Sequence, residues 1–189
     1  MAQEILGQNS LWSNFFRKRS EEDNSLEALL ASVPIFSQLT ARELRKLAAI
    51  VHKREYTSNE FVFSQGDPGL GMYVVQDGQV EIMFTDQAGV QKTLAVLKTG
   101  DFFGELSLLD ESPRSASAIA KGHSRIIGFF RPDLIDLLNR SPKSGTKILF
   151  KLGEVIGTRL RITNEQLGNA SANLERLEKN VGGKEDVDR

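Results

Sequence analysis

Short apolar runs separated by glycine turns fill the middle of the chain, and they limit its fold more than any other feature. The runs occupy residues 61–63, 72–75, 80–84, 93–97, 116–120 and 126–130. Glycines at 66, 78, 89, 100 and 122 stand between them. Many short strands with regular turn signals are typical of a small antiparallel barrel or roll. Asp77-Gly78 lies between two alternating runs and predicts a β-hairpin there.

Helical patterns precede the β-type runs. Residues 26–31 form a helical stretch that Pro34 closes. Thr40-Ala41-Arg42-Glu43 is a capping box, in which the Thr hydroxyl and the Glu carboxylate satisfy free N–H groups at a helix start. Apolar residues follow at helical spacing up to Val51.

Two further helices are predicted after the runs. Pro132 opens a short helix that reaches Asn139, because a proline at a helix start loses no hydrogen bond. Ser141-Pro142 opens a long helix that continues to about Asn180 and is ended by Gly182-Gly183. The predicted fold class is therefore α+β: a β-roll, like a jelly roll or double-stranded β-helix, with N-terminal helices and a long C-terminal helix.

The composition excludes several kinds of chemistry. The 189 residues include no cysteine and carry a net charge of −1, so disulfides, thiolate metal sites and a general basic surface for nucleic acid are absent. The only histidines, His52 and His123, lie far apart, and we expect neither to bind a metal. No apolar run reaches the roughly 18 residues of a membrane span, and the N-terminus has no apolar signal core. We expect a cytoplasmic protein.

The predicted domain organisation has four parts. They are an N-terminal arm at 1–24, a helical entry plus roll at 25–140, a long helix at 141–181 and a tail at 182–189. The arm holds Trp12 and Phe16 shortly before Arg17-Lys18-Arg19. We favour an arm that is disordered or packs on its own domain; docking on a partner or a membrane surface is the alternative.

Residues 100–117 interrupt the β pattern and hold the polar groups that point to a ligand. A turn of helix starts at Gly104, and a helix start presents N–H groups that favour an anion. Arg114 can clamp phosphate oxygens at two points, with the Ser115 hydroxyl beside it. Glu105 repels phosphate but accepts hydrogen bonds from a sugar hydroxyl. The set describes a ribose phosphate; the spacing leaves open a Glu105–Arg114 salt bridge that closes a surface loop.

Two motifs carry a family resemblance. Residues 103–108 read FGELSL and residues 113–116 read PRSA, while residues 66–80 read GDPGLGMYVVQDGQV. These stretches resemble the phosphate-binding cassette and the upstream signature of the cyclic nucleotide-binding domain family. Catabolite-activator-type regulators, regulatory subunits of cyclic AMP-dependent kinase and cyclic nucleotide-gated channels share that domain. Val33-Pro34-Ile35-Phe36 is similar to the family's helical entry, and the resemblance covers roughly residues 26–160.

The resemblance implies a role for each residue of the cassette. Glu105 and the Gly104 amide would bind the ribose 2′-hydroxyl. Arg114 and Ser115 would bind the cyclic phosphate. The set of implied binding residues is Phe103, Gly104, Glu105, Leu106, Ser107, Arg114, Ser115 and Ala116, with the Ser107 and Ala116 amides helping at the phosphate and Leu97 and Ala95 facing the base.

The implied ligand is a cyclic nucleotide monophosphate, cyclic AMP rather than cyclic GMP. Family members that prefer cyclic GMP often carry threonine where this chain has Ser115, and those that prefer cyclic AMP often carry alanine, or serine in the bacterial regulators. Serine therefore leaves cyclic GMP as the alternative. We expect no catalytic cofactor and no metal.

The long helix carries a seam with alternating steps of four and three residues. Its members are Leu149, Gly153, Ile156, Leu160, Thr163, Leu167, Ala170, Leu174, Leu177 and Val181. This repeat predicts a coiled coil and a homodimer through residues 149–181; a helix that packs on its own domain is the alternative. Phe150, Lys151 and Arg159 are open candidates to cap the base. The residues that follow Asn180 are too few for a helix-turn-helix module, so we expect no DNA-binding domain.

The predicted function is a sensor that binds the nucleotide and signals to an unidentified protein partner through the C-terminal helix. A dimerisation scaffold whose pocket has lost its ligand is the alternative. We expect no enzyme, because the sequence lacks a metal cluster and a base–nucleophile pair. Ser144 and Lys147 match a serine-x-x-lysine pattern, but its companion motifs are missing.

Overall fold

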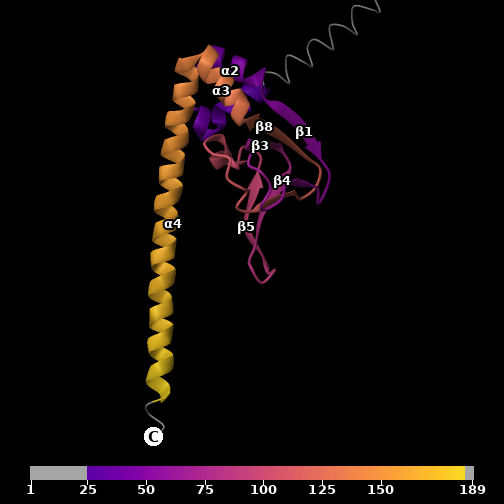
Figure 1. Cartoon of the computed structure of the whole chain (residues 1–189). Coiled ribbons are helices and arrows are strands. Elements are labelled where there is room, and N and C mark those ends of the chain that lie inside the picture. Colours follow the sequence, from indigo (N-terminus) through magenta and orange to yellow (C-terminus); the bar gives the residue numbers. More distant parts are fainter. Residues whose placement is uncertain (1–24, 186–189) are drawn as a thin grey trace, which may run out of the picture. The chain divides into compact units, whose positions relative to one another are not determined.

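A β-roll with helices before and after it makes up the fold (Figure 1). The computed structural model describes residues 25–185, so the predicted arm at 1–24 and the last residues, 186–189, lie outside the described part. The chain divides into two compact units after Lys151. The first holds the roll, its flanking helices and the first turns of the long helix, and the second holds the rest of that helix.

The helices form where the sequence predicts them. Residues 25–32 are helical, and the further helices are η1 (Pro34–Phe36), α2 (Ala41–Ala48), α3 (Arg131–Arg140) and α4 (Pro142–Glu185). The capping box at α2 is confirmed: Thr40 Oγ1 accepts from the Glu43 N–H at 3.4 Å, and the Glu43 carboxylate accepts from the Thr40 N–H at 2.8 Å.

The end of α4 differs from the prediction. The helix does not stop near Asn180 but passes through Gly182 and Gly183 as far as Glu185, the last residue that the structure describes. Glycine lowers helix stability by about 1 kcal/mol per residue, but it ends a helix only where the backbone turns into the left-handed region. The glycine pair alone therefore did not fix the end.

Within residues 25–185, eight strands form two antiparallel sheets. Their bounds are β1 His52–Tyr56, β2 Phe61–Phe63, β3 Gly71–Asp77, β4 Gln79–Thr85, β5 Gln91–Lys98, β6 Phe102–Phe103, β7 Ser117–Ala120 and β8 Ser124–Phe130. One sheet has the order β1-β8-β3-β6 and the other β2-β7-β4-β5. Together with the helices they confirm the predicted α+β class and the roll.

Strand β1 was not predicted, and its residues explain why. It reads HKREY, and only Tyr56 is buried. It pairs with β8 alone, so it is an edge strand held by backbone hydrogen bonds rather than by an alternating apolar face. Strand β6 is only two residues long, and its second residue, Phe103, is the first residue of the predicted cassette.

The hairpin predicted at Asp77-Gly78 is wrong. Strands β3 and β4 meet at Gly78 but belong to different sheets. Only one residue separates them, with φ of +89°, and a Cβ at that position would lie 2.8 Å from the His123 carbonyl oxygen. The glycine therefore makes a corner where the chain crosses between sheets, not a two-residue hairpin turn.

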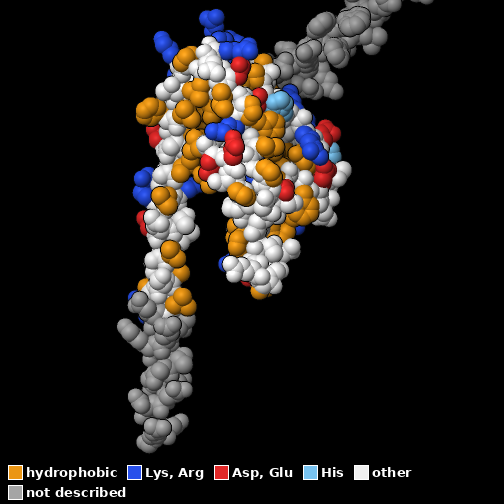
Figure 2. Space-filling model, in the orientation of Figure 1, with side chains coloured by type: hydrophobic (Ala, Val, Ile, Leu, Met, Phe, Trp, Pro, Cys, Tyr) orange, Lys and Arg blue, Asp and Glu red, His pale blue; other side chains and the backbone are white. Residues whose placement is uncertain are grey.

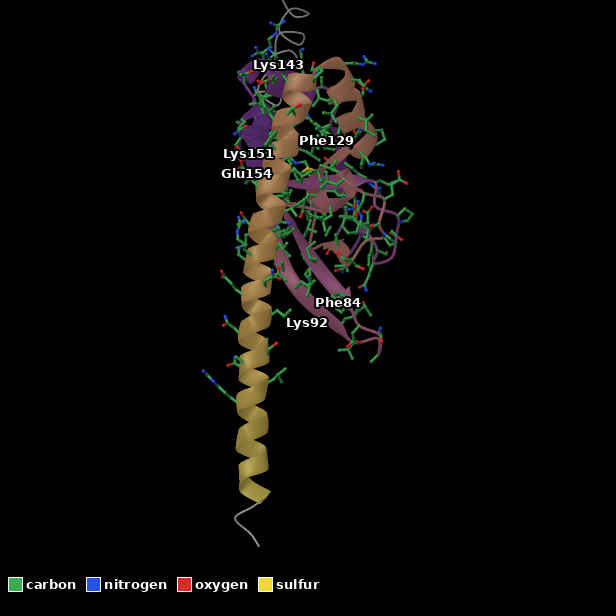
Figure 3. All side chains as sticks on the ribbon, turned by 60° about the vertical axis from the view of Figure 1, so that its left-hand side comes forward. Phe84, Lys92, Phe129, Lys143, Lys151 and Glu154 are labelled. Atoms are coloured by element: carbon green, nitrogen blue, oxygen red, sulfur yellow. The ribbon has the colours of Figure 1, made fainter. Side chains whose placement is uncertain are left out.

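A true hairpin joins β4 and β5. Phe84 pairs with Lys92 near its tip (Figure 3), and the Asp86 carboxylate accepts from the Ala88 and Val90 amides at 2.9 Å in the turn. Strand β5 is an edge strand whose side chains are exposed apart from the half-buried Leu97.

The core of the roll lies between the two sheets. Its buried members are Tyr56, Val75, Val80, Phe103, Ala118, Ala120 and Ile126. Phe103 is the last residue of β6, so the core holds the start of the predicted cassette in place. The half-buried rings of Phe63 and Tyr73 pack against the same cluster.

Candidate functional site

Gly104 turns the chain from strand β6 into the short helix η2 (Glu105–Leu108). Its φ is +71°, a left-handed conformation that glycine adopts at little cost. The turn carries Glu105 and Ser107 into the protein, where both are buried. The predicted turn of helix after Gly104 is therefore present as a 3₁₀ helix. Two of its polar side chains lie in the interior of the protein.

Arg114 is the central cation of this region. Its side chain is only 6% exposed. Nη1 donates to the Gly104 carbonyl at 3.1 Å and to Ser107 Oγ at 2.9 Å, and Nη2 donates to the Gly71 carbonyl at 2.8 Å. Those three acceptors are neutral. In the described part of the chain, Nε of Arg114 is the buried side-chain polar atom that has no hydrogen-bond partner.

Aromatic rings lie against the guanidinium. Its central carbon is 4.1 Å from the centroid of Phe63 and 5.6 Å from that of Tyr73, and the Phe103 ring stacks on Tyr73 at 5.5 Å. Burial lowers the pKa of the Arg114 guanidinium, while nearby Tyr73 and Asp67 oppose that shift. Because arginine titrates only above about pH 12, Arg114 stays charged at neutral pH.

The upstream signature holds the backbone of Arg114. The Arg114 N–H donates to the Asp67 carbonyl at 2.8 Å, and its carbonyl accepts from the Gly66 N–H at 2.9 Å. Gly69 leaves no room for a side chain, since a Cβ there would collide with Ser107 Oγ and lie 2.7 Å from the Ser112 carbonyl. The two motifs are separate in sequence but build one structure around Arg114, which we call the nest.

The remaining predicted residues divide between this nest and the surface. Phe103 and Ala116 are buried, and Leu106 and Ser115 are exposed beside the nest. Ala95 and Leu97 are on β5, paired with Ile82 and Val80 of β4. Ala95 is exposed, and Leu97 packs against the core, so a base-facing role for either stays a prediction.

The alternative of a Glu105–Arg114 salt bridge stays a prediction as regards the pairing, because the charge of Glu105 acts to raise the pKa of Arg114, but the two side chains do not lie where that alternative puts them. Glu105 is 5% exposed and Arg114 is 6% exposed, so neither side chain lies at the surface. Burying a charged pair only to close a loop would be costly, because both groups lose their hydration.

Sequence reasoning missed three partners of Arg114. The Phe63 ring, the Tyr73 ring and the Gly71 carbonyl surround its guanidinium. Gly71 and Tyr73 lie inside the upstream signature, which could have identified them as part of the site rather than of the strand alone. Phe63 has no such signal, because its place opposite Arg114 depends on the pairing of β2 with β7.

The nest is suited to binding an anion that also carries hydroxyl groups. It offers a buried cation, one N–H of which has no hydrogen-bond partner within residues 25–185, together with a buried serine hydroxyl and a buried carboxylate. Among residues 25–185, no group of three or more His, Asp or Glu side chains could hold a metal. No helix in the same range is long and apolar enough to span a bilayer.

Known proteins resemble this chain in sequence and in fold. The sequence profile described as "Cyclic nucleotide-binding domain" matches residues 53–141. The N-terminal domain of a transcriptional regulator from Streptomyces coelicolor superposes with a TM-score of 0.64 at 31% identity, over 72% of this chain and 95% of that one. The chain belongs to the cyclic nucleotide-binding domain family.

Two curated relatives contain a segment similar to this cyclic nucleotide-binding domain. The cyclic AMP receptor protein of Thermus thermophilus is 35% identical over 134 residues, which are 71% of this chain and 60% of the relative. The cAMP-dependent protein kinase regulatory subunit of Pyricularia oryzae is 37% identical over 114 residues, 60% of this chain and 27% of the relative. The chain thus spans less than two thirds of either relative.

Proposed function

We propose that this domain binds one cyclic nucleotide monophosphate in the nest around Arg114 and acts as a sensor of it. The observation that carries the proposal is the buried guanidinium of Arg114: within residues 25–185 it donates to the neutral acceptors of Gly104, Ser107 and Gly71, and its Nε has no hydrogen-bond partner. A buried charge is costly unless a counter-charge or hydrogen bonds compensate it. A cyclic phosphate would supply a negative charge and acceptor oxygens at that point.

The roles of the individual residues follow from chemistry and family resemblance. Arg114 and Ser115 bind the phosphate oxygens, with the Ser107 and Ala116 amides. Glu105 and the Gly104 amide bind the ribose 2′-hydroxyl, because a carboxylate accepts from a hydroxyl but repels a phosphate. Leu97 and Ala95 on β5 face the base.

Cyclic AMP is the proposed ligand. The names of the bacterial and fungal relatives both contain cyclic AMP. Ser115, a serine as in the bacterial regulators, is compatible with that choice. Cyclic GMP is the competing ligand, because a hydroxyl at this position can also reach a guanine amino group.

The proposed output runs through α4. Leu160, Leu167 and Leu174 lie seven residues apart, and their side chains are 58%, 65% and 60% exposed. Exposed leucines at this spacing favour a parallel coiled coil with a second copy. We infer a homodimer through residues 149–181 that passes the nucleotide state to a protein partner; the side chains of Leu177 and Val181 lie outside the described part.

Calorimetry and thermal unfolding test the proposal. Protein refolded from denaturant to remove copurified nucleotide is titrated with cyclic AMP and, separately, with cyclic GMP. We expect cyclic AMP to bind more tightly, and at about one hundred times its Kd to stabilise the fold by about 2.7 kcal/mol. Cyclic AMP recovered unchanged by chromatography supports a sensor, and a product peak contradicts it. No heat and no thermal shift with either nucleotide would favour the scaffold without a ligand.

A further inference from the structure

A hollow lies between α2 and the first turns of α4, and none of the residues that line it belongs to the nest around Arg114. Its volume is about 660 Å³, and both elements belong to the first compact unit. Four cations line it: Arg42, Lys46, Lys143 and Lys147. Figure 2 shows Lys and Arg side chains gathered at this end of the molecule, and Figure 3 labels Lys143 at the start of α4.

The cations are arranged as two like-charged pairs. Arg42 and Lys46 are four residues apart on α2, and Lys143 and Lys147 are four residues apart on α4. Residues at this spacing are neighbours on one helix face, where equal charges destabilise the helix. The hollow brings both pairs together although the whole chain has a net charge of −1. An anion in the hollow would relieve this repulsion.

The Glu43 carboxylate, which lines the hollow, already accepts four hydrogen bonds. Glu43 accepts from Lys147 Nζ at 2.6 Å, from Ser144 Oγ at 2.9 Å, and from the Thr40 N–H and hydroxyl at 2.8 and 2.9 Å. These bonds, that from Lys147 above all, lower its pKa to about 2. The negative charge of Glu43 is therefore compensated by Lys147.

Arg42, Lys46 and Lys143 are the cations that stay available. Within residues 25–185 none of them has an acidic partner. One is an arginine, whose planar group binds two phosphate oxygens at once, and two are lysines, which act as point charges. This combination matches a ligand with several phosphate oxygens better than a single carboxylate.

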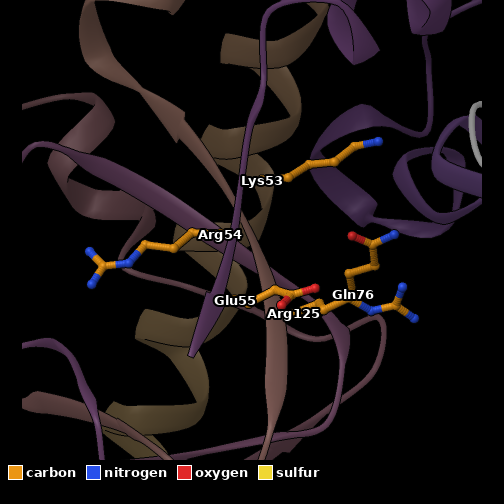
Figure 4. Close-up of a pocket in the computed structure, with 5 residues that line it drawn as sticks. All are labelled: Lys53, Arg54, Glu55, Gln76 and Arg125. Atoms are coloured by element: carbon orange, nitrogen blue, oxygen red, sulfur yellow. The ribbon is translucent and has the colours of Figure 1, made fainter. Parts of the chain in front are cut away.

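A hollow beside strands β1, β3 and β8 provides a contrast. It is also lined by basic residues, Lys53, Arg54 and Arg125, together with Glu55 and Gln76 (Figure 4). There, however, both arginines have acidic neighbours: Arg54 binds Glu60 at 2.8 Å and Arg125 binds Asp77 at 3.4 Å. The two arginines of that hollow are thus paired with carboxylates, whereas Arg42, Lys46 and Lys143 have no acidic partner within residues 25–185.

We propose that Arg42, Lys46 and Lys143 form a second anion site, which takes a group bearing two or more phosphates, either a free pyrophosphate-type anion or a bisphosphorylated lipid headgroup. The site does not depend on the nest around Arg114, and its ligand would bridge α2 and α4. A ligand that bridges two elements favours the conformations in which they lie together.

Titration with inorganic pyrophosphate at low ionic strength tests the free anion. The decisive variant is Arg42→Ser/Lys46→Ser/Lys143→Ser, and its matched control, Arg45→Ser/Lys53→Ser/Lys92→Ser, removes the same charge from exposed positions that do not line the hollow. We expect the wild type to bind pyrophosphate. The first variant should bind it at least tenfold more weakly, and the affinity of the control should change less than twofold. Equal losses in the two variants would overturn the site, because they would show a general charge effect.

Vesicle flotation distinguishes the lipid source. Phosphatidylcholine vesicles with and without about 5% phosphatidylinositol bisphosphate are used with the same three proteins. If flotation depends on Arg42, Lys46 and Lys143 and pyrophosphate does not bind, the ligand is a lipid headgroup. If pyrophosphate binds and the protein does not float with the vesicles, the ligand is a free anion. Binding of neither probe by the folded wild type overturns the proposal.

Two further measurements distinguish the proposed anion site from the cyclic nucleotide site. Arg114→Ala should bind pyrophosphate as the wild type does, and the Arg42/Lys46/Lys143 variant should keep its affinity for cyclic AMP. Loss of pyrophosphate binding in Arg114→Ala would move the anion to the nest and contradict the second site.

Discussion

A Cβ atom at Gly104 would lie 2.6 Å from Nη1 of Arg114. The same glycine accepts a hydrogen bond from that nitrogen through its carbonyl. The absence of a side chain at one residue therefore decides where the guanidinium of the other can lie. Because Gly104 also has φ of +71°, the steric and the conformational demands at this position coincide.

Gly104→Ala is expected to weaken cyclic nucleotide binding, because the new methyl group displaces the guanidinium. Gly100→Ala is the matched control: its φ is +92°, but a Cβ there meets nothing within 4 Å. Both variants should lose about 1–2 kcal/mol of stability from left-handed strain. Only Gly104→Ala should lose affinity in calorimetry; an equal loss of affinity in both would contradict the contact with Arg114.

Arg114→Ala should weaken cyclic AMP binding about ten- to a hundredfold, since a charge-assisted hydrogen bond contributes about 1.5–3 kcal/mol. Arg114→Lys keeps the charge but loses the planar fork, so it should restore only part of the affinity. Arg125→Ala, at an exposed arginine outside the nest, serves as the control. Unchanged affinity in Arg114→Ala, measured by calorimetry, would refute the site.

Glu43 makes the stability depend on pH in the acid range. Its pKa is about 2 in the folded protein against 4.5 ordinarily, chiefly because of Lys147. Folding favours the ionised form, so this contribution is complete above about pH 4.5 and is lost as the pH falls towards 2. It amounts to at most about 3 kcal/mol, less the part removed by solvent screening.

Denaturation of the wild type and Glu43→Gln at several pH values measures this contribution. The variant should be less stable at pH 7, and the difference should shrink between pH 4.5 and 2. A difference in unfolding free energy that is the same at pH 7 and pH 2.5 would show that the Glu43 charge is not its source.

The proposed dimer predicts different effects for two exposed positions of α4. Leu167 belongs to the seam and is 65% exposed, whereas Ile162 lies off the seam and is 49% exposed. Leu167→Gln should raise the dimer dissociation constant at least tenfold in sedimentation experiments, because it removes apolar surface from the interface. Ile162→Gln should leave it nearly unchanged, and the same effect from both would exclude this seam.

The sequence by itself determined the local features. The capping box at Thr40, the start of α4 at Pro142 and the glycine turn at Gly104 each depend on residues close together in the chain. The apolar runs likewise placed six of the eight strands found in the described part of the chain to within a few residues. These features are predictable because backbone geometry and hydrophobic periodicity act over short distances.

Only the tertiary structure decided which strands pair and what surrounds Arg114. Gly78 sends β3 and β4 into different sheets, and the charged strand β1 exists because β8 offers it an edge. The ring of Phe63 reaches the guanidinium through the pairing of β2 with β7, across a large separation in sequence. Such contacts depend on how the two sheets close over their core, which no local pattern encodes.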